Sequence, residues 1–344
     1  MAGLMRPPLT RDQVVAAVER RGGGDVPLLM VKWWGIGLRD ALGPALDELS
    51  ERCPDDFCAA FYDEPGNEVS HTANPEYRFG YRDYNEDKRH GTGDAIDLLS
   101  DWADLDRFLA HFPNPDEPGS FDRVIEAADN AGGRYKLGGW WRLFHERMWA
   151  FRGMENLMID YYEHMDELKI LGAQLVAYYK KIIDRYHALG FDGIFSSDDL
   201  GHQKGPMMSP AVFEELYLPL YSELIGYTHD RGMHFFLHSC GDNSLLMEYL
   251  IQAGLDVFHP VQKGCMDMRE TAEKYGGRIS FLAGMDVQHI LVEGTPDDVR
   301  REVREMKSIF GRPDGGLLFA MGNGVMPGTP LENIEAALEE MAMA

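Results

Sequence analysis

Residues 234–242 have the sequence HFFLHSCGD, an apolar run that ends in polar side chains. An apolar run of this length followed by a segment of helical periodicity is typical of a strand–helix unit on a parallel sheet. Seven further runs of the same kind occur along the chain, at residues 27–32, 57–62, 134–140, 193–197, 257–261, 279–283 and 317–321. Eight such units predict an α/β fold, a (β/α)8 TIM barrel.

A long polar segment, residues 67–129, separates the second and third predicted strands. It is too long and too rich in Asp, Pro and Gly for a simple connection, so an insertion is predicted. Because the loops that follow the strands surround the active end of a barrel, we expect this insertion to form a lid or an oligomer contact. A homodimer is compatible with this expectation, and a disordered excursion is the alternative. The whole chain, residues 1–344, is expected to form one barrel domain.

The composition excludes several classes of partner. The formal net charge is −24, from 57 acidic and 33 basic residues, which disfavours binding to nucleic acid or to an anionic membrane. No apolar run approaches the roughly 20 residues that span a bilayer, and residues 1–21 are too polar for a signal peptide. These features predict a cytoplasmic protein. Four cysteines in a chain of this length do not indicate a disulfide framework, and Cys53 and Cys58 are expected to be small core side chains.

His238 and Cys240 stand just past the end of the fifth predicted strand, where side chains of a barrel face the active site. They are two residues apart, so both side chains fall on the same side of an extended chain. Imidazole nitrogen and thiolate sulfur are ligands of zinc, and a catalytic zinc takes three protein ligands. Cys265, past the next strand, is the candidate for the third ligand. The alternative is a structural histidine beside a buried cysteine.

Asp198 and Asp199 follow the apolar strand at residues 193–197, and either carboxylate could act as a catalytic acid or base. Asp also caps turns, which is the alternative for each of them. His202 is a further catalytic candidate, or else a surface loop residue. Aromatic and polar side chains past other strand ends are predicted to bind the substrate: Trp33, Trp34, Gln203, Gln262, Asp286 and Asn323. One of the two tryptophans is expected to belong to the core.

Six ordered motifs resemble the uroporphyrinogen decarboxylase superfamily: DDLGHQ (198–203), LHSCGD (237–242), HPVQ (259–262), CMDM (265–268), GMDVQ (284–288) and PGTPLENI (327–334). The resemblance extends from about residue 149 to the carboxyl terminus. This superfamily contains decarboxylases that need no metal and methyltransferases that act with a corrinoid, commonly with zinc. The arginine-rich motif of the decarboxylases is not found around residues 26–40, and the His-x-Cys-Gly motif is similar to that of the methyltransferase branch.

The resemblance implies methyl transfer of the O-demethylase type, between a small methylated compound such as a methoxylated aromatic and a corrinoid carried by a partner protein. It implies zinc at His238 and Cys240, with Asp199 or His202 protonating the leaving group. The chain has Asn323 where the family often has His or Cys, so Cys265, His202 or an acidic residue would complete the metal shell. Otherwise the metal is lost, and His238 and Cys240 bind the substrate directly. Two other functions stay open. One is decarboxylation of a porphyrinogen-like or other small carboxylated substrate, and the other is binding of a ligand or a corrinoid by a non-catalytic barrel.

Overall fold

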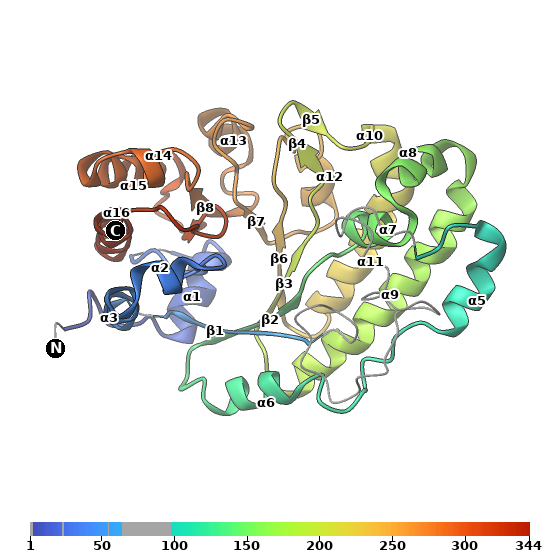
Figure 1. Ribbon diagram of the computed structural model, residues 1–344, viewed down its shortest axis with the longest axis horizontal. Helices are drawn as coiled ribbons and strands as arrows, with labels where there is room; N and C mark the ends of the chain where they lie inside the picture. Colours follow the sequence, from blue (N-terminus) through green and yellow to red (C-terminus); the bar gives the residue numbers. More distant parts are fainter. Residues whose placement is uncertain (1–2, 23, 54, 64–97) are drawn as a thin grey trace.

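The computed structural model describes residues 3–22, 24–53, 55–63 and 98–344. Within these ranges, seven parallel strands form one sheet in the order β1-β2-β3-β6-β7-β8-β9 (Figure 1). The strands are β1 (Phe57–Phe61), β2 (Tyr135–Trp140), β3 (Gly193–Ser197), β6 (His234–His238), β7 (Val257–His259), β8 (Ser280–Met285) and β9 (Leu317–Met321). Each coincides with a strand expected from the sequence, so the predicted barrel-type fold is confirmed.

Helices follow the strands and cover the outside of the sheet. The long α9 and α11 lie on one side of the strands in Figure 1, and α13 to α16 lie on the other. The helices are α1 (Arg11–Val18), α2 (Leu38–Leu42), α3 (Pro44–Arg52), η3 (Trp102–Asp104), α5 (Leu105–Ala110), α6 (Asp122–Asp129), α7 (His145–Arg152), α8 (Met154–Glu163), α9 (Met165–Ala188), α10 (Pro210–Val212), η4 (Phe213–Tyr217), α11 (Leu218–His229), α12 (Met247–Gln252), α13 (Met268–Tyr275), α14 (Ile290–Glu293), α15 (Pro296–Phe310) and α16 (Leu331–Ala342). A short hairpin, β4 (Gly201–His202) and β5 (Gly205–Pro206), follows β3. Among the described helices, none has both the length and the apolar character to cross a membrane.

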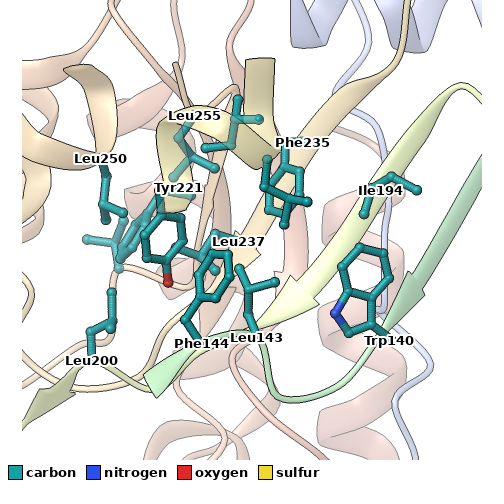
Figure 2. Packing of buried hydrophobic residues seen from close by; sticks show 14 of the residues in the cluster. Trp140, Leu143, Phe144, Ile194, Leu200, Tyr221, Phe235, Leu237, Leu250 and Leu255 are labelled. Atoms are coloured by element: carbon teal, nitrogen blue, oxygen red, sulfur yellow. The ribbon is translucent and has the colours of Figure 1, made fainter. Parts of the chain in front are cut away.

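The core has two layers because side chains alternate along each strand. Phe235 and Leu237 of β6 pack in the outer layer against the helices, and Figure 2 shows them there with Tyr221 and Leu250. Phe236, between them, belongs to a separate inner cluster with inward side chains of the other strands. The same alternation directs His238 inward, at the carboxyl end of the sheet.

The first predicted strand, residues 27–32, differs from the others. It joins β9 through a single bridge between Leu28 and Phe319, and Leu29 N donates to Phe319 O at 3.0 Å. Among the described residues, no backbone hydrogen bond connects it to β1. A cavity of about 450 Å³ lies at this seam and is lined by residues 28–33 and by Phe57, Cys58 and Ala59 of β1.

The buried carboxylate of Asp56 bridges the seam. It accepts hydrogen bonds from Leu28 N at 2.7 Å and from Leu9 N at 2.8 Å, and it forms an ion pair with Arg6. Asp56 therefore joins the first segment and the amino-terminal residues to the start of β1.

The predicted insertion lies only partly within the described residues. Residues 64–97 fall outside them, and residues 98–129 contain η3, α5 and α6. Leu99 and Phe108 are fully buried, and the ring of Phe108 packs 5.0 Å from that of Phe151 in α7. This part of the segment thus belongs to the helical layer of the barrel, and the role of the segment as a lid stays a prediction.

Replacing Asp56 is expected to lower the stability of the whole barrel. Asp56→Ala leaves two buried N–H groups and the Arg6 guanidinium without their acceptor, which costs about 3 kcal/mol of unfolding free energy. Asp55→Ala is the matched control, because Asp55 is half exposed and pairs only with Lys32 at the surface, so its loss costs less than about 1 kcal/mol. Urea denaturation followed by circular dichroism measures both. Equal midpoints for the two variants would contradict the structural role of Asp56.

Candidate metal centre and active site

Three donor side chains meet at the carboxyl end of the sheet. His238 ends β6, Cys240 lies two residues further on, and Asp199 follows β3. The Nε2 atom of His238 is 3.3 Å from Sγ of Cys240 and 3.6 Å from Oδ1 of Asp199. Each of these residues offers one ligand atom, and the three atoms lie within 4.8 Å of one another.

Two loops hold these donors in place by hydrogen bonds between them. Leu200 N donates to Oγ of Ser239 at 3.0 Å, and Asp242 N donates to the carbonyl of His202 at 2.8 Å. Gly241 lies at the contact with a φ of +82°, and a Cβ there would be 2.3 Å from the carbonyl carbon of Gly201. A side chain at residue 241 would therefore separate the loops that carry Asp199 and Cys240.

Burial controls the protonation of His238 and Cys240 when no cation is bound. Burial lowers the pKa of His238, so its imidazole is neutral near pH 7, and Asp199 opposes this shift only in part. Burial raises the pKa of the Cys240 thiol far above its ordinary value, and the carboxyl groups of Asp199 and Glu146 raise it further. A cation between the donors would favour the thiolate instead.

The donor set fits zinc. Zinc–ligand bonds of about 2.0–2.3 Å in a tetrahedron place neighbouring nitrogen, oxygen and sulfur ligand atoms about 3.4–3.6 Å apart. The two distances from His238 Nε2, 3.3 and 3.6 Å, agree with this spacing. Three protein ligands leave the fourth position of a catalytic zinc for a substrate.

The candidate third ligand from the sequence, Cys265, lies outside this set of three. Its amide donates to Gln262 O in a tight turn that follows β7, and its thiol is partly exposed. Asp199 takes its place in the donor set, and Asp199 Oδ1 also accepts a hydrogen bond from Cys240 N at 2.8 Å. Asp199 is therefore the residue best placed to be the third metal ligand, in place of the His or Cys that the family often has at the position of Asn323.

Asp198 lies on the opposite side of the chain from Asp199 and is fully buried. Its carboxylate accepts hydrogen bonds from three consecutive backbone amides, those of Phe144, His145 and Glu146, and from the hydroxyl of Tyr221 at 2.6 Å. Burial raises the pKa of Asp198 to about 6, although these hydrogen bonds oppose the shift. The structure thus places Asp198 at the start of α7, as a cap, and not among the donors.

The other predicted residues lie in different surroundings. His202 and Gln203 are exposed on the β4–β5 hairpin. Trp34 packs against the core and donates Nε1 to Oγ of Ser50 at 3.2 Å. Trp33 lies in the barrel interior, with its ring 5.8 Å from His238 and 5.6 Å from Trp141.

A small cavity of about 40 Å³ adjoins Cys240 at the ends of β7, β8 and β9. Three predicted substrate-binding residues, Gln262, Asp286 and Asn323, line it together. Gln262 accepts from Gly241 N at 2.7 Å, and Asn323 Nδ2 lies 3.8 Å from Sγ of Cys240. These amides are therefore part of the wall around the donor set.

Glu146 is a site residue that the sequence did not indicate. It lies in the first turn of α7, is partly buried, and accepts a hydrogen bond from Oγ of Ser197 at 2.7 Å. Burial and the neighbouring carboxylates of Asp199 and Asp198 raise its pKa to about 8. Glu146 is thus a neutral acid at pH 7 beside Asp199. Its only sequence signal was its place in the segment after a strand, since it stands six residues past the end of β2.

The comparisons with known proteins agree with this geometry. The family model described as uroporphyrinogen decarboxylase (URO-D) matches residues 138–343. A curated relative, the methylated-thiol–coenzyme M methyltransferase of Methanosarcina mazei, is 30% identical over 130 residues, which are 38% of this chain and 32% of the relative. The match therefore spans about a third of the length of that relative.

A solved structure, a methyltransferase from Methanosarcina mazei, superposes with a TM-score of 0.64 over 99% of this chain and 98% of its own, at 18% sequence identity. At this identity the likeness shows a shared fold. The family match covers more than half of the chain and includes the strands that carry His238, His259 and Asn323. The chain belongs to the uroporphyrinogen decarboxylase family.

Proposed function

We propose that the protein is a methyltransferase that moves a methyl group between a small methylated compound and a corrinoid carried by a partner protein. The observation that carries the proposal is the donor set of His238, Cys240 and Asp199 at the carboxyl end of the barrel. The Methanosarcina mazei relative, a methylated-thiol–coenzyme M methyltransferase, supports the same reaction class.

The chemical task of such a site is to stabilise the atom that loses the methyl group. His238, Cys240 and Asp199 would hold a zinc ion, which when bound supplies Lewis acidity to the leaving oxygen, nitrogen or sulfur. The methyl group departs without its bonding electron pair, so the leaving atom keeps that pair and gains negative charge. A proton donor next to it lowers the barrier further.

Glu146 is the side chain best suited to give this proton. The sequence suggested Asp199 or His202, but Asp199 lies in the donor set and His202 is exposed on the hairpin. The Glu146 carboxyl is protonated near pH 7 and interacts with both Asp199 and Cys240. After the transfer, the leaving atom holds the proton, and the Glu146 carboxylate regains one from water.

The surroundings favour a flat donor such as a methoxylated aromatic. Trp33 and Trp141 are 5.6 Å apart, and Phe61 stacks on Trp141 at 5.3 Å, so an aromatic surface extends from His238 along the barrel interior. An aromatic ring of a substrate can pack against such a surface. The amide side chains of Gln262 and Asn323 line the small cavity beside Cys240 and can orient polar substituents.

Loss of the metal ligands is expected to abolish zinc binding and activity together. Wild-type protein should carry about one equivalent of zinc by elemental analysis, and His238→Ala and Cys240→Ala should carry none while keeping the circular dichroism spectrum. Cys265→Ala is the matched control and should keep its zinc, because Cys265 lies outside the donor set. Methyl transfer to a corrinoid is followed by absorbance over a panel of O-, N- and S-methyl donors.

Full activity in both ligand variants would overturn the proposed site. Release of carbon dioxide from a porphyrinogen, without methyl transfer, would indicate a decarboxylase instead. Stoichiometric binding of a donor or corrinoid without turnover would indicate a non-catalytic barrel.

The reaction with an oxygen donor is expected to slow as the pH rises through about 8, because Glu146 loses its proton there. Glu146→Gln keeps the shape of the side chain but cannot donate the proton, so kcat should fall by about 10²-fold at pH 7, and the fall of the rate above pH 8 should disappear. Glu155→Gln, which alters an exposed carboxylate of α8, is the control. An unchanged pH profile in Glu146→Gln would rule out this role.

A further inference from the structure

A second histidine lies directly behind the donor set. His259 ends β7 and is the register partner of His238 across the β6–β7 pair, so both side chains point into the barrel. The two Nδ1 atoms are 2.7 Å apart, and His259 Nε2 is 3.2 Å from the carbonyl oxygen of Met321 in β9. Both imidazoles are almost completely buried.

The distances determine how many protons the pair can share. Two imidazole nitrogens 2.7 Å apart hold one proton between them, since two protons would collide and none would oppose two lone pairs. The carbonyl of Met321 can only accept, so His259 Nε2 carries a proton and donates it. A neutral imidazole carries one proton, so the neutral pair has two protons, one between the rings and one on His259 Nε2.

In the neutral pair, His259 has its one proton on Nε2, so its Nδ1 is an acceptor and His238 Nδ1 is the donor. His238 Nε2 then carries a lone pair that faces Cys240 Sγ and Asp199 Oδ1. The opposite arrangement would place a lone pair of His259 against the Met321 carbonyl and a proton on His238 Nε2, where a metal must bind.

We propose that His259 is a positioning residue that fixes His238 in the tautomer whose Nε2 can bind a metal, through the chain His238 Nδ1–H to His259 Nδ1 and His259 Nε2–H to Met321 O. The inference rests on the proposed metal centre of the methyltransferase. Such outer contacts orient the ligand ring, and their loss typically weakens metal binding about 10- to 100-fold.

The backbone holds His259 for this role. Ser239 N donates to His259 O at 2.9 Å, which joins β7 to the loop of the donor set. The ring of Phe195, from β3, lies 6.4 Å from that of His259 within the barrel interior. Three strand ends, those of β6, β7 and β9, thus contribute to the chain of hydrogen bonds.

The test uses two substitutions of the full-length protein. His259→Phe keeps a planar ring but removes both nitrogens, so zinc should dissociate about 10- to 100-fold more readily in competition with a chelator. His259→Asn offers an oxygen acceptor near the position of Nδ1, so it should keep most of the wild-type affinity. Nitrogen-15 spectra of the metal-free protein report the tautomer of His238 directly and should show a proton on Nδ1 in the wild type and in His259→Asn, and a mixture in His259→Phe.

A wild-type protein whose metal-free His238 carries its proton on Nε2 would overturn the inference, and so would wild-type zinc affinity in His259→Phe. The spectra need neither metal nor methyl donor. If the wild type binds no zinc, the proposed metal centre fails, while the tautomer in the spectra still decides whether His259 positions His238. Melting temperatures of the metal-free variants identify a change that comes from folding alone, because a folding defect would not alter the tautomer of the native protein.

Discussion

The buried carboxylate of Asp198 determines where the chemistry of this barrel can take place. It binds three backbone amides at the first turn of α7 and the hydroxyl of Tyr221 from α11, so it joins the end of β3 to two helices. A carboxylate at the amino-terminal end of a helix is also favoured by the helix dipole. The same contact brings Glu146, in that first turn, next to Asp199, the residue that follows Asp198 in the chain. One structural acid thereby brings the carboxyl groups of Glu146 and Asp199 together.

The two faces of the donor set have different characters. Rings of Trp33, Trp141 and Phe61 extend from His238 through the barrel interior, while amides and backbone groups surround Cys240. Apolar surface on one side excludes water, and this strengthens the electrostatic interactions among His238, Asp199 and Glu146. A substrate with a flat apolar body and one reactive heteroatom has complementary surroundings in such a site.

Most of the sheet could be predicted from the sequence, because buried parallel strands have short apolar runs bounded by polar residues. The rule that parallel strands end at the same edge of a sheet led to the choice of His238, Cys240, Asp199, Gln262 and Asn323. The structure brings these residues close together, while their roles stay predictions. The rule was less informative past the strand ends, where side chains no longer alternate. Cys265 lies in a tight loop outside the donor set, and Asp198 and Asp199 have different partners although they are neighbours. Glu146 and the pairing of His259 with His238 depend on contacts between distant segments, which a single sequence does not contain.

The connection between residues 27–32 and β1 differs from the connections between the other strands of the barrel. The strands from β1 to β9 are joined by backbone ladders in the described part of the chain, whereas side-chain contacts, those of Asp56 and the Lys32–Asp55 ion pair, span the gap at this seam. The sheet is therefore curled but not closed, because no backbone hydrogen bond among the described residues joins its two edges at this seam. Widening at this seam would break no ladder hydrogen bond between the strands of the sheet, so we expect opening of the barrel to occur beside Trp33 and Trp141, which line the cavity there, and not at β6, which is paired on both sides.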